Sequence, residues 1–273
     1  MAIFHLNISP AGAGAGAKRA YIEREGKYKG ADKYEDLKAH GSQNLPSWAK
    51  DSADFWKEDE KSEGGNQYRE IRLALPKELP ADRQEEIVKN FCQANLADHA
   101  LTWAIHENTG RLSGEKNPHA HIIFCERKID PSRPEPGRDE YFQRSRKKDG
   151  QVSGGYPKDR EITGKDRKQW LRKIRKSAEE IMNRELQRAG INERVSCETL
   201  ESQGIDRQAS HHVGPRRTTQ INQAREALEK KKESYASKIQ ELAEKESTAQ
   251  RLREGIVAKR ANFHIKRDRG KSR

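Results

Sequence analysis

The stretch LTWAIHENTGRLSGEKNPHAHIIFCERKI, residues 101–129, decides the fold of this chain. Its first part, LTWAIHE (101–107), is apolar almost to its end, which is typical of a buried strand. Its last part, NPHAHIIFCERKI (117–129), begins at an Asn-Pro turn and continues as a second strand. If the two strands pair as neighbours, they bring three histidines together.

Two of these histidines stand two positions apart in the second strand. Because successive side chains of a strand point to opposite faces, His119 and His121 project from one face. Ala120 and Ile122 then point to the opposite, packed face. His106 ends the preceding strand and completes the set. Three neutral imidazoles on a rigid sheet leave coordination positions open, which suits metal-assisted chemistry. Ordinary polar alternation on a surface strand is the alternative explanation.

Further strands and helices are expected on both sides of this pair. AIFHLNI (2–8) and REIRLALP (69–76) have the composition of strands. PADRQEEIVKNFCQANLADH (80–99) carries apolar residues at helical spacing, and so does the segment 165–190. The order of strand, helix, strand and strand favours an α+β domain.

Three segments lack such a pattern. Residues 10–17 (PAGAGAGA) predict a flexible turn, followed by a short basic helix that ends at Gly26 or Gly30. Residues 31–66 are polar and predict an excursion of loop and helix outside the core. Residues 131–165 are rich in proline, glycine and charge and predict a long loop that need not be ordered. The isolated aromatic residues of the excursion are expected to pack, with stacking on bases as the alternative: Trp48, Phe55 and Trp56.

The C-terminal part of the chain has a different composition. Residues 220–257 are rich in Glu, Lys and Ala and predict a long exposed helix. Leu228, Tyr235 and Leu242 are seven residues apart, which favours a weak coiled coil. Residues 251–273 hold nine Lys or Arg against two Asp or Glu and predict a basic, disordered arm.

The overall charge points to a polyanionic partner. The net charge is +12, and 36% of the residues are charged against 32% that are hydrophobic. Positive surfaces bind nucleic acid through counterion release, and solubility alone is the alternative reason for the charge. The sequence has no signal peptide, no long apolar run and no CxxC pair among its three cysteines. These features predict a cytoplasmic protein without a disulfide framework or a zinc knuckle.

One tyrosine near the N-terminus has surroundings that suit a nucleophile. Tyr21 lies in the basic segment KRAYIEREGKYKG (18–30). A tyrosine can attack a phosphodiester and form a phosphotyrosine. Its ordinary pKa near 10 makes nearby cations and a metal ion necessary at neutral pH. Tyr28, two helical turns further on, is the alternative nucleophile, and either tyrosine could instead be a surface aromatic residue.

Together these segments resemble the MobA/MobL-type plasmid mobilization relaxases, a family within the HUH endonucleases. MAIFHL is similar to the first strand of that family, and KRAYIEREGKY (18–28) is similar to its nucleophile segment. AIHENTG (104–110) and NPHAHIIFCER (117–127) resemble its two metal-binding strands. The resemblance extends over residues 1–215 through REIRLALPKEL (69–79), the helix that contains Trp170, and TLESQGIDRQASHHVGP (199–215).

The resemblance implies a fold and a division into domains. The fold is an antiparallel five-stranded sheet flanked by helices, with the histidines on the exposed face and the tyrosine on a nearby N-terminal helix. A relaxase domain is expected at residues 1–215, a helical or coiled-coil extension at 216–257 and a basic disordered tail at 258–273.

The resemblance also implies the roles of single residues. Tyr21 matches the catalytic tyrosine, and the metal ligands match His106, His119 and His121. Glu70 is the candidate proton acceptor for the tyrosine. A second carboxylate often follows two positions later in the family, but this chain has Arg72 there. The basic side chains expected to bind DNA phosphates are Lys18, Arg19, Arg24, Lys27 and Arg127.

The implied activity is a strand-specific nick at a plasmid origin of transfer, through a covalent 5′-phosphotyrosine that is later religated. Mg²⁺ or Mn²⁺ is the implied cofactor, although imidazoles alone suit Zn²⁺ or Ni²⁺ equally well. The expected partners are single-stranded and supercoiled plasmid DNA, accessory mobilization proteins and the type IV secretion coupling machinery. Transfer of the protein with the DNA strand is a further expectation, and the loop 131–165 is expected to help bind DNA.

Three other functions fit parts of the pattern. A rolling-circle replication initiator uses similar chemistry, but it generally places its tyrosine after the histidine strand. A non-catalytic DNA-binding regulator and a small zinc-binding protein are the alternatives from other classes.

Overall fold

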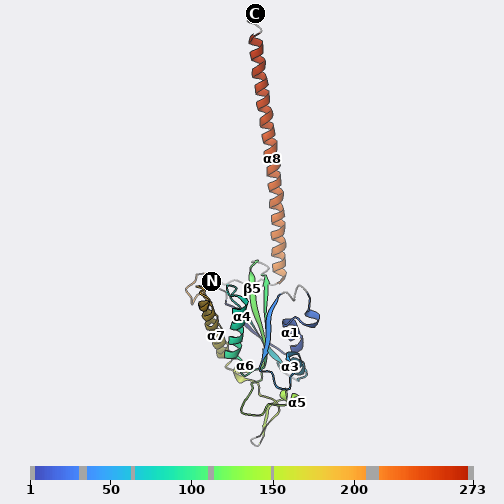
Figure 1. Ribbon diagram of the computed structural model, residues 1–273, viewed down its shortest axis with the longest axis vertical. Helices are drawn as coiled ribbons and strands as arrows, with labels where there is room; N and C mark the ends of the chain where they lie inside the picture. The colour runs from blue at the N-terminus through green and yellow to red at the C-terminus, as the bar shows by residue number, and fades with distance from the viewer. Residues whose placement is uncertain are drawn as a thin grey trace. The chain divides into compact units, whose positions relative to one another are not determined.

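The structure is a computed structural model that describes residues 4–30, 36–62, 65–109, 114–148, 151–206 and 215–269. The chain divides into two compact units, Met1–Ala209 and Ser210–Arg273. The first unit is an α+β domain built on a five-stranded antiparallel sheet, as the sequence predicts, and the described residues of the second unit form one long helix (Figure 1). The segment 207–214, which contains part of the motif TLESQGIDRQASHHVGP, lies outside the described residues.

Five strands form the sheet, in the order β1-β3-β5-β4-β2. Every neighbouring pair is antiparallel. The pairing of the two histidine strands is confirmed, with β5 at the centre of the sheet. The strands are β1 (Leu6–Ala11), β2 (Leu37–Gln43), β3 (Tyr68–Ala74), β4 (Leu101–Thr109) and β5 (Lys116–Cys125).

Strand β2 corrects the prediction that residues 31–66 contain only loop and helix. Its sequence LKAHGSQ has no run of apolar residues, because an edge strand pairs on one side only and half of its positions face solvent. It is held against β4 by backbone pairing and by the close approach of Gly41 to the Trp103 ring. Neither contact leaves a local signal in the sequence.

Two helices cover one face of the sheet, α4 (Ala81–Asn95) and α7 (Arg167–Arg188) (Figure 1). Apolar residues of both helices meet the sheet at i, i+3 and i+4 spacing, as predicted. The sheet contributes the inward-facing positions of its central strands to this core: Ile71, Leu73, Trp103, Ile105, Ala120, Ile122 and Phe124. Each of these strands places its alternate residues on the opposite face, where the histidines lie.

Helices α1 (Ala15–Ile22) and α3 (Ser52–Asp59) pack on that opposite face. Phe55 and Trp56 are completely buried there, and the Trp56 Nε1 donates a hydrogen bond of 2.9 Å to the Thr102 hydroxyl. These rings are therefore packing anchors that bases cannot reach. This second core also includes Ala15 and Ile22 of α1, which brings the end of that helix to the histidine face of the sheet.

Helix α1 lies earlier in the chain than the sequence predicts. It begins at Ala15, within the segment PAGAGAGA expected to be a flexible turn, and it ends at Ile22, before either predicted glycine. Gly14 allows this start because it adopts φ +80, and the small residues that follow let the helix pack closely against α3. Ala15 is completely buried, so packing decides the conformation of a segment of low complexity.

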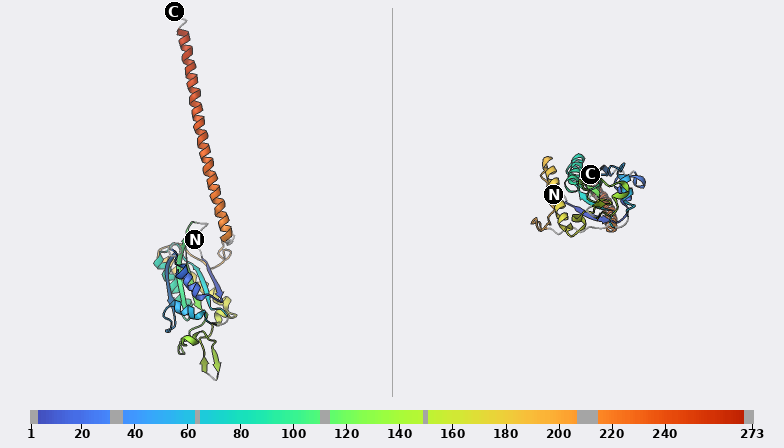
Figure 2. Two further views of the ribbon diagram at one scale, coloured as in Figure 1. Left: turned by 90° about the vertical axis from the view of Figure 1, so that its right-hand side faces the viewer. Right: turned by 90° about the horizontal axis from the view of Figure 1, so that it is seen from below.

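The predicted long loop 131–165 is folded over most of its length. It contains α5 (Arg138–Tyr141), the hairpin of β6 (Arg146–Lys148) and β7 (Gln151–Ser153), and α6 (Arg160–Thr163). Figure 2 shows the hairpin at one end of the domain. Buried Tyr141 and Tyr156 pack edge to face and anchor the segment, a tertiary contact that its polar composition conceals.

The second unit is helix α8 (Pro215–Arg269). The predicted helix is present, but it continues through most of the segment 258–273 that was expected to be disordered. Residues 216–269 contain one glycine and no proline, so nothing in the sequence ends the helix before Gly270. Among the described helices of the chain, none is both long and apolar enough to cross a bilayer.

Candidate functional site

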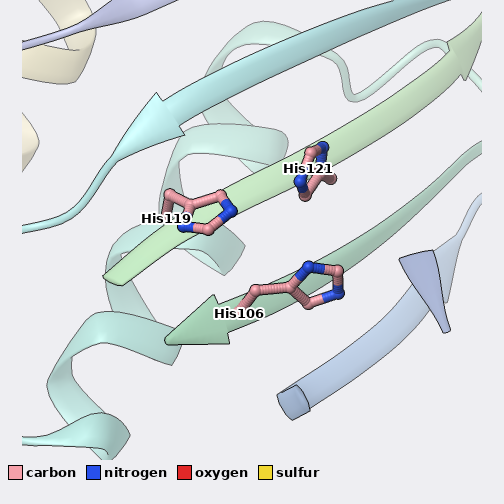
Figure 3. Close-up of side chains that lie close together, drawn as sticks. All are labelled: His106, His119 and His121. Atoms are coloured by element: carbon pink, nitrogen blue, oxygen red, sulfur yellow. The ribbon is translucent and has the colours of Figure 1, made fainter. Parts of the chain in front are cut away.

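Three histidines from β4 and β5 converge at one end of the sheet (Figure 3). His106 is directly opposite His119 in the β4–β5 register, and His121 follows two positions later on the same face. One ring nitrogen from each side chain lies within 4.8 Å of the others. His106 and His121 are buried and His119 is partly exposed, so the cluster opens toward solvent on one side.

Hydrogen bonds to nearby oxygen acceptors determine which ring nitrogen of each histidine carries the proton. The Nδ1 of His121 donates to the Glu70 carboxylate at 2.6 Å, and the Nδ1 of His119 donates to the Asn117 carbonyl at 2.9 Å. Both rings therefore keep Nε2 as the unprotonated nitrogen. His106 is the reverse case, because its Nε2 donates to the Ile22 carbonyl at 2.7 Å and its unprotonated Nδ1 accepts from Arg24 Nη2 at 3.3 Å.

Burial keeps two of these rings neutral. It lowers the pKa of His106 to about 4, against the raising effect of the Ile22 carbonyl. It also lowers the pKa of His121, assisted by the charge of Lys18 and opposed by Glu70. A neutral imidazole is the form that binds a metal ion. Three imidazoles with ring nitrogens within 4.8 Å of one another fit a divalent metal with open positions, which would take the Nδ1 of His106 from Arg24.

Tyr21 stands beside this cluster. It is the penultimate residue of α1, and its ring centroid is 6.3 Å from that of His121 and 6.4 Å from that of His106. Two cations lie over the ring, with Lys18 Nζ at 5.1 Å and Arg24 Cζ at 4.7 Å from its centroid. Tyr28 packs edge to face on Tyr21, with 5.4 Å between the ring centroids.

Glu70 lies in the site, but its surroundings make it a poor base. Burial opposes ionisation of its carboxyl, yet the hydrogen bonds from His121 and Lys18 outweigh burial and lower its pKa to about 2. Lys18 Nζ is 2.8 Å from Oε1, the same oxygen that accepts from His121. A carboxylate with so low a pKa takes up a proton from tyrosine only weakly.

The five side chains predicted to bind phosphates differ in burial and in the partners that they already have. Arg19 is buried and paired with Glu23 and Glu25, so its charge is already neutralised. Arg127 is also buried and donates to the carbonyls of Tyr156 and Phe142. Arg127 follows the C-terminal end of β5, away from His119, and its hydrogen bonds hold the segment 131–165 against the sheet.

The three other predicted cations lie close to Tyr21 or Tyr28. Arg24 is buried and paired with Asp36. Lys18 is partly exposed between Tyr21 and Glu70. Lys27 is exposed and lies 5.1 Å from the centroid of the Tyr28 ring. Lys18 and Lys27 are therefore the two of these five side chains that are not buried.

Arg72 is a cation of the site that the sequence reasoning did not select. It is directly opposite His121 in the β3–β5 register, and the two side chains share one face of the sheet. Its side chain is exposed, and within the part of the chain that the structure describes it makes no ion pair. The sequence did contain a signal for this position: Arg72 is two residues after Glu70 in a predicted strand, so both side chains lie on the same face.

Comparisons with known proteins agree with this architecture. The sequence model of the MobA/MobL family matches residues 13–225. The chain is 37% identical over 216 residues to the 43 kDa relaxation protein of Salmonella typhimurium, covering 76% of this chain and 57% of that protein. It is 34% identical over 221 residues to Mobilization protein A of Escherichia coli, covering 79% of this chain and 30% of that protein. The chain thus spans between about a third and just over half of the length of these curated relatives.

A solved structure described as "Molecular Basis of Vancomycin Resistance Transfer in Staphylococcus aureus" has a similar fold. Its TM-score is 0.52 at 22% identity, over 72% of this chain and all of that one. This likeness supports the fold, and the match of the family model over residues 13–225 decides the relationship. The chain belongs to the MobA/MobL family.

Proposed function

We propose that this chain is a relaxase, which nicks one DNA strand at a plasmid origin of transfer and remains attached to its 5′ end. The observation that carries the proposal is the position of Tyr21, whose ring lies beside two histidines of a three-histidine cluster and under two cations. Membership of the MobA/MobL family and the names of the two curated relatives support the same activity.

The reaction is an exchange of phosphodiester bonds. The Tyr21 hydroxyl loses a proton and its oxygen bonds to the scissile phosphorus. The bond to the 3′ oxygen breaks, and that oxygen takes up a proton as the free 3′-hydroxyl. Because the phosphotyrosine keeps the energy of the bond, a 3′-hydroxyl can attack it later and religate the strand.

His106, His119 and His121 would hold the divalent metal, with Mg²⁺ or Mn²⁺ as the proposed ion. When bound, it supplies a Lewis acid that withdraws charge from a nonbridging oxygen of the scissile phosphate. Glu70 fixes the ring of His121 with Nε2 free, and we assign it this positioning role in place of proton acceptor. Lys18 and Arg24 stabilise the developing phenolate of Tyr21.

The DNA contacts proposed here are Lys18, Lys27 and Arg72. All three are accessible cations near Tyr21, Tyr28 or the histidines, and this supports their assignment as phosphate contacts. The partly folded segment 131–165 is kept as a proposed DNA contact. Accessory mobilization proteins and the secretion coupling machinery are proposed partners of the segment beyond residue 215.

The order of the site along the chain argues against a rolling-circle replication initiator. Tyr21 precedes the histidine strands β4 and β5, the reverse of the usual order in those proteins. A regulator without activity needs no tyrosine placed against three histidines. Neither alternative accounts for the geometry as a whole.

The test is the nicking of a supercoiled plasmid that carries the cognate transfer origin, in Mg²⁺ or Mn²⁺. Tyr21→Phe is expected to abolish the nick and the protein bound to the 5′ end, while DNA binding is nearly retained. Tyr28→Phe is the matched control and is expected to nick. The assignment fails if Tyr21→Phe nicks at the wild-type rate, and the metal is unnecessary if a His119→Ala/His121→Ala protein nicks in chelator.

A further inference from the structure

Helix α1 ends in a backbone arrangement that normally requires glycine. The amide of Glu25 donates to the Ala20 carbonyl at 2.8 Å, and the amide of Arg24 donates to the Tyr21 carbonyl at 3.3 Å. These are the two hydrogen bonds of a Schellman motif, in which the residue at the position of Arg24 is left-handed. Arg24 has φ 56, a region that an arginine backbone rarely adopts.

The side chain of Arg24 is buried together with its strained backbone. Its residue is 4% exposed, and its Nε has no hydrogen-bond partner among the described residues. Glycine at this position would remove the backbone strain and the buried Nε at once. The presence of an arginine in this strained, buried position points to a role for its guanidinium group, because backbone strain is concentrated at functional sites.

The guanidinium connects the nucleophile to the histidine cluster. Its Nη1 donates to the Tyr21 carbonyl at 3.2 Å, and its Cζ lies 4.7 Å from the centroid of the Tyr21 ring. Its Nη2 is 2.5 Å from Asp36 Oδ2 and donates to the Nδ1 of His106 at 3.3 Å. Asp36 is 10% exposed and precedes β2, so the fork of Arg24 ties the end of α1 to the edge of the sheet.

We propose that Arg24 is the positioning residue of the nucleophile: it holds the Tyr21 side chain at a fixed distance from the histidine cluster by binding the Tyr21 backbone, covering its ring and pairing with Asp36. The inference rests on the proposed function, because positioning matters only if Tyr21 attacks. A lysine cannot replace this arginine, since an ammonium group is a point donor without a planar fork.

The chain contains a close counterpart of this arrangement away from the site. Arg138 donates to the carbonyl of Trp48 at 3.0 Å, lies 4.8 Å from the centroid of a Trp48 ring and pairs with Asp54 at 2.5 Å. The same three contacts there join α3 to the segment 131–165. Arg138→Ala/Asp54→Asn is therefore the matched control for loss of an arginine that clamps an aromatic residue.

The experiment compares Arg24→Gly/Asp36→Asn, Arg24→Lys and the Arg138 control in the full chain. The double variant leaves no buried carboxylate unpaired and relieves the left-handed backbone, so it is expected to melt no lower than the wild type.

Nicking of a saturating single-stranded origin oligonucleotide by the double variant is expected to slow by about 30-fold or more, since small displacements of reacting groups cost about this much. The affinity for the oligonucleotide is expected to change by less than about 3-fold, because the loss falls on the chemical step. Arg24→Lys is expected to stay at least about 10-fold slow.

A second readout does not depend on nicking. In NMR spectra of the chain with ¹³C-labelled tyrosine, the Tyr21 signal is identified by its loss in Tyr21→Phe. It is expected to shift or broaden in both Arg24 variants, while the signals of Tyr141 and Tyr156 stay in place. The Arg138 control is expected to leave the Tyr21 signal unchanged.

Three results would overturn the inference. They are a rate within about 2-fold of the wild type in the double variant, full rescue by lysine, and an unmoved Tyr21 signal. If the wild type itself does not nick, the proposed function fails, and the Tyr21 signal still decides whether Arg24 positions the ring.

Discussion

The Glu70 carboxylate on β3 reaches diagonally across the sheet to His121 on β5, with 2.6 Å between Oε1 and Nδ1. The backbone partner of Glu70 is Ile123, one diagonal step from His121 in the antiparallel register. Lys18 of α1 holds the same carboxylate at 2.8 Å. One side chain thus links the helix of the nucleophile, the central strand and a candidate metal ligand.

Glu70→Gln is expected to weaken metal binding. The neutral amide orients His121 less firmly and removes a charge that favours the ion, and such losses typically cost about 10- to 100-fold in affinity. Titration calorimetry with Mn²⁺ measures the change. The matched control is Glu107→Gln, because Glu107 of β4 pairs with Lys116 and Lys38 outside the cluster. Equal affinities of Glu70→Gln and the wild type would contradict the positioning role.

Arg72→Ala is expected to weaken binding of a single-stranded origin oligonucleotide. Arg72 is exposed opposite His121, so its loss removes one phosphate contact and lowers the slope of log affinity against log salt by about 1. Fluorescence anisotropy at several salt concentrations gives both quantities. Arg83→Ala on α4, which covers the other face, is expected to leave the slope unchanged. An unaltered slope in Arg72→Ala would exclude it from the DNA path.

Asp59 is expected to make the stability of the first unit depend on pH. Burial raises the pKa of this carboxyl from 3.8 to about 8, in spite of the charges of Arg127 and Lys158. Between these two values the unfolded chain releases a proton that the folded chain keeps. The free energy of unfolding therefore falls as the pH rises from about 4 to 8, by up to about 1 kcal/mol per pH unit.

Asp59→Asn removes this titration and is expected to flatten the profile. Urea unfolding of both proteins between pH 5 and 8 measures the difference, which should grow with pH in favour of the variant. Parallel profiles would show that Asp59 titrates below this range.

Gly41→Ala is expected to loosen the edge strand β2. A Cβ atom at this position would lie 2.9 Å from Cζ2 of Trp103, so the indole or the strand must move. Overpacking of this kind costs about 1–3 kcal/mol of the free energy of unfolding. Gly30→Ala, where a Cβ meets nothing within 4 Å, is the control. Identical stabilities of the two variants would mean that the Trp103 ring yields without cost.

The sequence by itself determined the two central histidine strands of the sheet and the two helices that cover its other face. The apolar run before His106 and the alternation around His119 and His121 are local patterns with a period of two, so they predict the strand pair and the shared face of the histidines. The spacing of apolar residues in α4 and α7 is likewise local and predicts both helices. Basic neighbours within a few residues made Tyr21 and Tyr28 candidate nucleophiles, and the resemblance to the MobA/MobL family favoured Tyr21.

Only the tertiary structure decided what the other polar residues do. Arg19, Arg24 and Arg127 look alike in the sequence, yet burial and distant partners convert them into internal ion pairs and hydrogen bonds. Glu70 became a partner of His121 for the same reason. Burial and the pairing of distant residues have no periodic signature, because they depend on which segments the completed fold brings side by side.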